Sequence, residues 1–213
     1  MAEVVSLVVG PLEVNCYIVW DDKTLDAFVI DPGGDAEDIL DAVKKEGLKV
    51  RYIINTHGHF DHVGADAAVK AASGAPLAIH RDDSALLSDA QEQGAIFGVK
   101  TGKAPAADLL LSGGEELKAG TTVLKVIHTP GHTKGGICLF DEAGGLLFTG
   151  DTLFAGSVGR TDFEGGSYDE LMASIKRKIL PLGDSVRVFP GHGPESTIGE
   201  EKETNPFISS ARA

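Results

Sequence analysis

Short apolar runs alternate with more polar segments along the chain, and most of the runs end close to glycine, proline or aspartate. Such runs are typical of β-strands, whereas apolar residues that recur every three or four positions are typical of helices with one buried face. The pattern predicts strands at residues 4–9, 15–20, 27–30, 50–54, 76–79, 121–127, 136–140, 146–149 and 186–189. It predicts helices at residues 35–45, 64–72, 82–87 and 168–180, with Asp35 and the pair Ser167 and Glu170 as capping residues.

The order of the predicted elements occurs twice. Three strands, a helix and one further strand fill residues 4–54, and the same order fills residues 121–189. This repetition predicts a mixed α/β fold in which two β-sheets pack face to face with helices outside, in a single domain whose halves are about 1–115 and 116–213. Residues 91–107 lack periodicity and are expected to form a long loop anchored by Ile96, Phe97 and Val99.

The composition is that of a globular protein. Hydrophobic residues make up 42% and charged residues 24% of the 213 residues, and no apolar run approaches the roughly 20 residues that span a bilayer. A formal charge of −13 argues against nucleic acid as a partner. The first residues lack the features of a secretory signal peptide, so we expect a cytoplasmic protein. Cys16 and Cys138 lie in strand-like runs and are expected to be buried thiols.

A dense group of metal-binding residue types follows the strand predicted at 50–54. Residues 55–64 read NTHGHFDHVG and contain His57, His59, Asp61 and His62. The first two histidines point the same way if the loop is extended, while Asp61 and His62 fall in the first turn of a helix. Imidazole and carboxylate groups are ligands for zinc, iron or manganese. This loop therefore has enough donors to contribute to two ion sites.

Three later strands each lead to one further donor. His132 lies in HTPGHT, Asp151 in FTGDT and His192 in FPGHG, and glycine precedes each of them. Glycine permits close approaches that a side chain would block, as expected where several loops converge on metal ions. His80 and His128 lie at strand ends outside this set, and we expect them to be hydrogen-bonded structural residues.

Together with the stretches GPLEVNCYIV, VIDPGGD, GHTKGGICLF, SVGRTDFEGGS and TIGEEKETNPF, these donors give a chain that resembles the metallo-β-lactamase superfamily, and within it the glyoxalase II-like hydrolases. The resemblance implies a four-layer αβ/βα sandwich and two divalent metal ions, with zinc favoured over iron or manganese. It implies a first ion held by His57, His59 and His132, a second held by Asp61, His62 and His192, and Asp151 as a bridge between them.

The resemblance also implies a reaction. Members of this group hydrolyse thioesters such as S-lactoylglutathione, so we expect a small-molecule S-acylglutathione substrate, with Asp61 as the catalytic residue that orients the attacking hydroxide. Arg160 and Phe163 match the loop that contacts glutathione, and Asp31 is expected to support the metal ligands by accepting a histidine N–H. Full-length glyoxalase II enzymes carry a C-terminal helical domain that binds glutathione, and we expect none here because only 213 − 192 = 21 residues follow His192.

Two alternatives remain open from the sequence. A mononuclear iron persulfide dioxygenase shares the GRTDF stretch and uses two histidines and one carboxylate, but its pattern usually has cysteine before GRTDF, where this chain has Val158. A metal-binding scaffold without catalytic activity is the other alternative, and the presence of all seven donors argues against it. The sequence does not indicate the oligomeric state.

Overall fold

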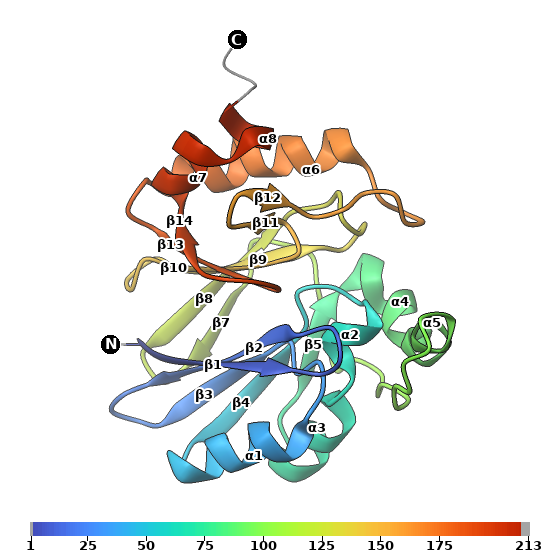
Figure 1. Cartoon of the computed structure of the whole chain (residues 1–213). Coiled ribbons are helices and arrows are strands. Elements are labelled where there is room, and N and C mark those ends of the chain that lie inside the picture. The colour runs from blue at the N-terminus through green and yellow to red at the C-terminus, as the bar shows by residue number, and fades with distance from the viewer. Residues whose placement is uncertain (1, 210–213) are drawn as a thin grey trace.

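Two mixed β-sheets face each other and helices cover their outer faces (Figure 1). This computed structural model describes residues 2–209; Met1 and residues 210–213, which the predicted domain bounds include, lie outside the described residues. One six-stranded sheet has the order β1-β2-β3-β4-β5-β6, and the other has the order β14-β13-β10-β9-β8-β7. The predicted fold class is therefore confirmed.

The first sheet is built from the N-terminal half of the chain. Its strands are β1 (Ala2–Val9), β2 (Val14–Asp21), β3 (Asp26–Ile30), β4 (Lys49–Ile54), β5 (Leu77–His80) and β6 (Leu109–Leu111). β1 to β3 pair in antiparallel fashion and β3 to β6 in parallel fashion. The helices α1 (Ala36–Lys45) and α3 (Asp66–Ser73) connect the parallel strands and lie on the outer face (Figure 1).

The second sheet is built from the rest of the chain. Its strands are β7 (Glu116–Ala119), β8 (Thr122–His128), β9 (Ile137–Asp141), β10 (Leu146–Gly150), β13 (Arg187–Pro190) and β14 (Ser196–Thr197). Its outer face is covered by α6 (Tyr168–Ser174), which continues as a π-helical turn (Ile175–Ile179) and a 3-10 turn (Leu180–Leu182), and by α7 (Ile198–Thr204) and α8 (Pro206–Ser209). β8, β9, β10 and β13 pair as antiparallel, antiparallel and parallel, the same sequence as β1 to β4.

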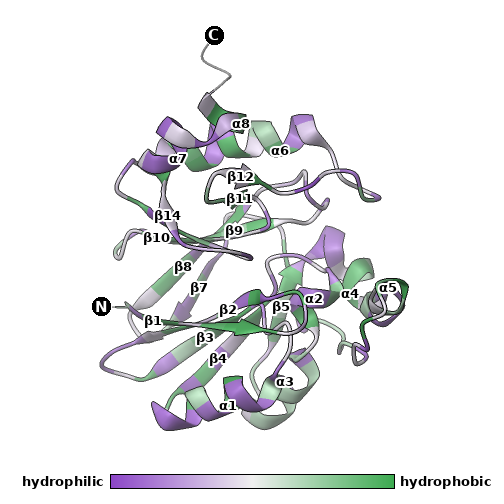
Figure 2. Ribbon diagram, in the orientation of Figure 1, coloured by the Kyte–Doolittle hydropathy of each residue, from purple (hydrophilic) through white to green (hydrophobic). Residues whose placement is uncertain are grey.

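Three apolar layers hold the sandwich together. The middle layer lies between the sheets and contains the fully buried rings of Phe28, Phe148 and Phe189. Burial of each such ring contributes about 1.5–3 kcal/mol. The outer layers pack residues such as Ile39 of α1 and Leu171 of α6 against the sheets. Figure 2 shows hydrophobic colours along β2 and hydrophilic positions on α1, as expected for a buried strand and a surface helix. No helix within residues 2–209 is long and apolar enough to cross a membrane.

The prediction of a loop over residues 91–107 was wrong for its first part. After the 3-10 turn η1 (Arg81–Asp83) and α4 (Ser84–Ser88), residues Ala90–Ile96 form the helix α5. Its inward positions are the small residues Ala90 and Gly94, whereas Ile96 is 81% exposed and does not anchor the segment. The buried face of this helix therefore lacks the large apolar residues from which a helical pattern is normally recognised.

One predicted cap also differs. Asp35 stands at the N-cap of α1, but its side chain makes no capping hydrogen bond and instead accepts one from Gly10 N at 2.8 Å. Ser167 does accept the Glu170 N–H at the start of α6. A complete capping box lies at Thr197 and Glu200, at the start of α7.

Candidate metal centre

The seven predicted donors meet where loops from the two sheets approach each other. Their loops follow β4, β8, β10 and β13, and the short helix α2 (Phe60–Val63) carries Asp61 and His62. β3 and β4, and likewise β10 and β13, run in parallel, so their carboxyl ends open at one edge of each sheet. Three groups of donors have ligand atoms within 4.8 Å of one another: His57, His59 and His132; His57, His62 and Asp151; and Asp61, His62 and His192.

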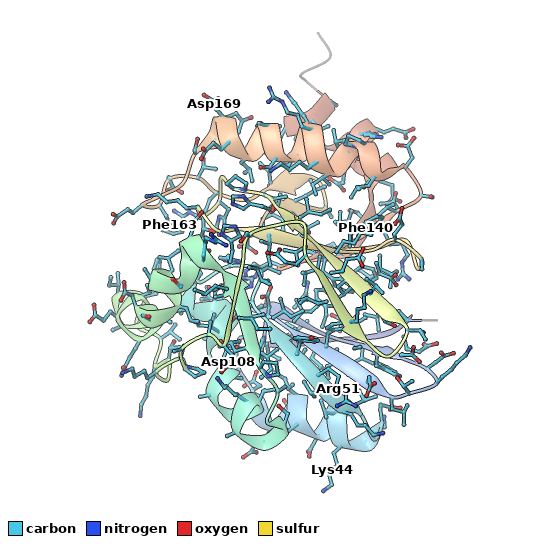
Figure 3. All side chains as sticks on the ribbon, turned by 180° about the vertical axis from the view of Figure 1, so that it is seen from behind. Lys44, Arg51, Asp108, Phe140, Phe163 and Asp169 are labelled. Carbon is cyan, nitrogen blue, oxygen red and sulfur yellow. The ribbon has the colours of Figure 1, made fainter. Side chains whose placement is uncertain are left out.

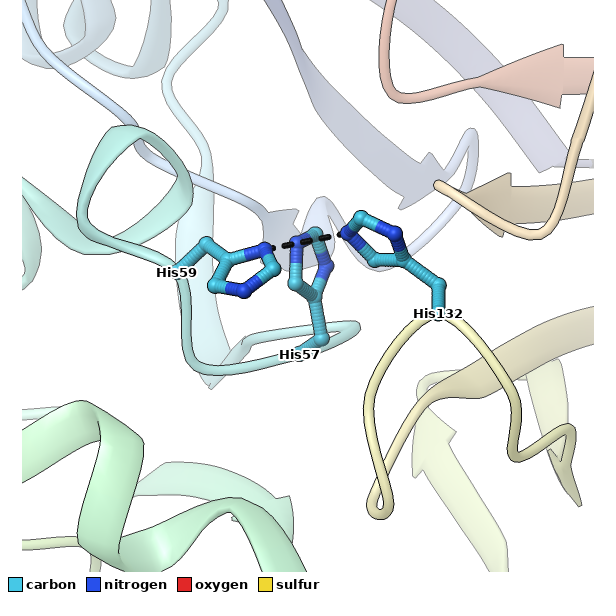
Figure 4. Close-up of side chains that lie close together, drawn as sticks. All are labelled: His57, His59 and His132. Atoms are coloured by element: carbon cyan, nitrogen blue, oxygen red, sulfur yellow. Dashed lines mark hydrogen bonds between the residues drawn. The ribbon is translucent and has the colours of Figure 1, made fainter. Parts of the chain in front are cut away.

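We call the first of these groups the His57 triad. Figure 4 shows its rings converging from the loop after β4 and the loop after β8. His132 Nε2 lies 3.0 Å from His59 Nδ1, and His57 Nε2 is buried without a hydrogen-bond partner among the described residues. His132 Nδ1 lies 2.7 Å from the carbonyl oxygen of Arg160, to which it donates its proton, so Nε2 keeps its lone pair.

The protonation of these rings fits metal binding. Burial lowers the pKa of His57, and the neighbouring histidines lower it further. Burial and His132 lower the pKa of His59 to about 3. Both rings are therefore neutral at physiological pH, and neutral imidazole is the form that binds metal ions.

The third group, Asp61, His62 and His192, is the Asp61 triad. Asp61 Oδ2 lies 3.4 Å from His192 Nε2 and 3.8 Å from His62 Nε2. Burial acts to lower the pKa of His62, but Asp151, Asp31 and Asp61 outweigh it and raise this pKa to about 10. The carboxylates thus create a strongly negative potential at a buried point, where a cation is stabilised.

Asp151 lies between the two triads. Its Oδ2 atom is 3.6 Å from His132 Nε2 and 3.8 Å from His192 Nε2, and its Oδ1 atom is 3.5 Å from His62 Nε2. Oδ1 is buried without a hydrogen-bond partner in the described part of the chain. A Cβ atom at position 191 would lie 2.3 Å from this oxygen, so Gly191 is required for the approach of the β13 loop.

The residues fit a pair of divalent ions. Nitrogen and carboxylate oxygen atoms converge, and among the described residues His57 Nε2, His62 Nε2 and Asp151 Oδ1 are buried and lack hydrogen bonds. A buried polar atom without a partner costs free energy unless another group binds it. The donor types suit zinc, iron and manganese alike.

Asp31 lies directly behind the Asp61 triad. It is 1% exposed, its Oδ1 accepts the Thr56 N–H at 2.7 Å, and its Oδ2 accepts the Thr56 hydroxyl at 2.6 Å. The same Oδ2 lies 3.0 Å from His62 Nδ1. Asp31 is thus placed to hold the Nδ1 proton of His62 and leave Nε2 free for a metal ion.

Arg160 and Phe163 lie at the rim of the site. The Phe163 ring is 5.6 Å from the ring of His59 and 6.2 Å from that of Phe97, and Figure 3 shows it on the side of the molecule that carries α4 and α5. The guanidinium carbon of Arg160 lies 3.9 Å from the centre of the Phe163 ring. Two nitrogens of this guanidinium each bind Asp162 at 2.7 Å. The sequence predicted Phe97 only as an apolar anchor of the loop at 91–107, and it did not predict this ion pair.

His80 and His128 form a fourth possible group with Asp82. Their rings stack at 4.1 Å with an angle of 13° between planes, so their in-plane lone pairs run side by side and do not converge on one ion. His128 Nε2 lies 2.9 Å from the Lys134 carbonyl oxygen, and His80 Nδ1 accepts the Asp82 N–H at 3.3 Å. The geometry is that of a structural contact between the ends of β5 and β8.

Comparison with known proteins identifies the family. The model of the metallo-beta-lactamase superfamily matches residues 9–192, and the chain belongs to that superfamily, as its resemblance predicted. The hydroxyacylglutathione hydrolase GloC of Haemophilus influenzae is 39% identical over 198 residues, which cover 92% of this chain and 93% of that protein.

Two solved structures are similar to this chain in both fold and sequence. The BLEG-1 B3 metallo-beta-lactamase superimposes with a TM-score of 0.91 at 39% identity, and the match covers 98% of this chain and 100% of that one. TTHA1623 in a di-iron-bound form superimposes with a TM-score of 0.89 at 39% identity, and the match covers 95% of this chain and 99% of that one.

Proposed function

We propose that this protein is a dinuclear metal-dependent hydrolase of thioesters whose substrates are S-acylglutathiones such as S-lactoylglutathione. The observation that carries the proposal is Asp151, which faces His132 of one triad and His62 and His192 of the other. A carboxylate in this position could offer one oxygen to each of two neighbouring ions. The relative named hydroxyacylglutathione hydrolase supports the substrate class, and the di-iron form of TTHA1623 supports the number of ions.

In this proposal the two triads and Asp151 would hold the ions. When bound there, two divalent ions supply a water molecule of lowered pKa and polarise a carbonyl group. Asp61 would orient the attacking oxygen by accepting a hydrogen bond from it. Burial acts to raise the pKa of Asp61, but His62 and His192 outweigh it and hold this pKa well below the usual range. Asp61 therefore remains an ionised acceptor throughout the physiological pH range.

The cysteines do not compete as nucleophiles. Cys16 and Cys138 are both completely buried. Burial raises the pKa of Cys16 well above its ordinary value and raises that of Cys138 to about 11. Since the thiolate is the nucleophilic form, both side chains are inert at neutral pH. Attack by water held in the metal centre is consistent with this chemistry.

A thioester suits the site because its leaving group needs little help. A thiol with a pKa of about 8.5 leaves as a thiolate near neutral pH, whereas an amide nitrogen must be protonated before it departs. The substrate has an apolar surface available at Phe163 and Phe97 beside His59. A cavity of about 260 Å³ next to Asp61, which Asp35 and Lys100 also line, offers room for the end of the substrate away from the reacting carbonyl group.

The test is a comparison of substrates on protein loaded separately with zinc, iron and manganese. We expect hydrolysis of S-lactoylglutathione, which is measured as the loss of thioester absorbance. We expect no oxygen consumption with glutathione persulfide. Asp61→Asn, which keeps the shape of the side chain and removes its charge, should abolish most of the hydrolysis. Oxygen uptake with the persulfide and no turnover of any thioester would instead support the mononuclear dioxygenase.

A further inference from the structure

Asp83 is a fully buried carboxylate that contacts both loops of the His57 triad. It is the last residue of η1, and its exposed fraction is 0%. Its Oδ2 atom accepts the Gly58 N–H at 3.1 Å and the Thr133 hydroxyl at 2.7 Å, and its Oδ1 atom accepts the Gly135 N–H at 2.6 Å. All three hydrogen bonds are made to a charged acceptor, which makes them stronger than neutral ones.

These partners are next to the metal ligands in sequence. Gly58 stands between His57 and His59, and Thr133 directly follows His132. The first loop follows a strand of one sheet and the second follows a strand of the other, so Asp83 joins the two sheets where the triad forms. The distance between His59 and His132 therefore depends on a side chain from a third segment of the chain.

The packing around Asp83 leaves little freedom. A Cβ atom at position 135 would lie 2.7 Å from Asp83 Oδ1, and one at position 58 would lie 2.8 Å from the Asp83 carbonyl oxygen. Both positions are glycine, which permits these approaches. The segment before Asp83 is fixed as well, because His80 accepts the Asp82 N–H and stacks on His128.

We propose that Asp83 is a positioning residue for the His57 triad. It sets the spacing of the two loops, and through that spacing it sets the affinity of the triad for its metal ion. The inference rests on the proposed metal centre but not on the thioester assignment. Loss of a group that orients metal ligands typically weakens metal binding by about 10- to 100-fold.

The test measures Zn²⁺ affinity by competition with a chromophoric chelator in two backgrounds. His192→Ala keeps the His57 triad intact, and there Asp83→Asn is expected to weaken Zn²⁺ binding by about 10- to 100-fold. His59→Ala keeps the Asp61 triad intact, and there Asp83→Asn is expected to leave the affinity unchanged. Equal weakening in both backgrounds, or no weakening in either, would overturn the proposal.

Two variants of Thr133 distinguish a positioning role of Asp83 from an effect of its charge. Thr133→Val removes the hydroxyl that Asp83 binds without changing any charge, and Thr133→Ser retains that hydroxyl. We expect weaker Zn²⁺ binding at the His57 triad in the valine variant and wild-type binding in the serine variant. Identical affinities in the two variants would show that Asp83 acts by charge alone and would refute a positioning role.

Asp21 supplies the matched control. It is equally buried, and its carboxylate accepts hydrogen bonds from Lys23 N, Thr24 N and Thr121 N, which joins the two sheets far from the metal loops. Asp21 ends β2 and precedes β3, at the end of the sheet opposite to the carboxyl ends of β3 and β4. Asp21→Asn should lower stability without changing either Zn²⁺ affinity. If Asp21→Asn changed Zn²⁺ affinity as much as Asp83→Asn does, the effect of Asp83→Asn would be due to general destabilisation.

Discussion

Asp31→Asn tests how the protein fixes the form of His62 that binds metal. Asp31 Oδ2 lies 3.0 Å from His62 Nδ1 and also accepts the Thr56 hydroxyl. In the variant, the amide oxygen can still accept the Thr56 N–H, while the amide nitrogen faces Thr56 Oγ1 and His62 Nδ1. His62 Nδ1 then accepts a hydrogen bond, so its proton moves to Nε2, the atom that faces Asp61 and Asp151.

The expected magnitude follows from these contacts. The wrong tautomer should weaken metal binding at the Asp61 triad by about 10- to 100-fold, which corresponds to about 1.4–2.8 kcal/mol. Stability should change little, because the hydrogen bonds to Thr56 are rearranged and not lost. Asp31→Ala should differ, since it leaves the buried Thr56 N–H unpaired at a cost of about 1–3 kcal/mol. Asp31 also has a φ of 50°, which asparagine tolerates better than alanine.

The assay is the same chelator competition, performed on wild type and Asp31→Asn, with thermal unfolding of the metal-free proteins recorded in parallel. Asp35→Asn is a suitable control, because Asp35 also has a positive φ, of 46°, but binds Gly10 N and no metal ligand. We expect one of the two ions to bind more weakly in Asp31→Asn than in the wild type, and both ions to bind with wild-type affinity in Asp35→Asn. Wild-type affinity for both ions in this variant would refute the tautomer argument.

Three further predictions concern the rim, the structural histidines and a thiol. Arg160→Ala should raise KM for S-lactoylglutathione by only roughly two- to fivefold with kcat unchanged, because the charge of Arg160 is already paired with Asp162. Asp162→Asn should lower KM for the same substrate, and the KM of uncharged thioesters should respond to neither change. His80→Ala and His128→Ala should retain both metal ions, as metal analysis will show, whereas loss of an ion would make their stack a ligand site. Burial raises the pKa of Cys138 from 9.0 to about 11, so between these pH values the folded protein holds a proton that the unfolded chain releases. The free energy of unfolding, measured by denaturant titration, should therefore fall more steeply from pH 9 to pH 11 in the wild type than in Cys138→Ala.

The sequence predicted those parts of the fold in which large apolar side chains mark the buried positions. Strands such as β4 and β10 are rich in apolar residues, and the loop after each of them contains glycine and metal-binding residue types, so the layers and the convergence of the seven side chains were predictable. The helix α5 was missed because it buries Ala90 and Gly94. The helix α7 was missed although its Thr197 and Glu200 capping box is visible in the sequence.

The role of Asp83 and the pairing of Arg160 could not be predicted from the sequence, for two different reasons. Asp83 meets Thr133 and Gly135 across 50 and 52 residues, and no local pattern distinguishes it from its neighbour Asp82. The pairing of Arg160 with Asp162 is local, yet a sequence does not show whether two residues in a loop face each other or the substrate. Positions set by tertiary contacts therefore required the structure.

The central claim is that Asp151 joins two triads into one dinuclear centre, and metal stoichiometry tests it most directly. Elemental analysis of the wild-type protein under metal-replete conditions should give two divalent ions per chain, and Asp151→Ala should lose the pair because its carboxylate faces His62, His132 and His192. A wild-type stoichiometry that stays at one ion per chain under the same conditions would contradict the dinuclear hydrolase.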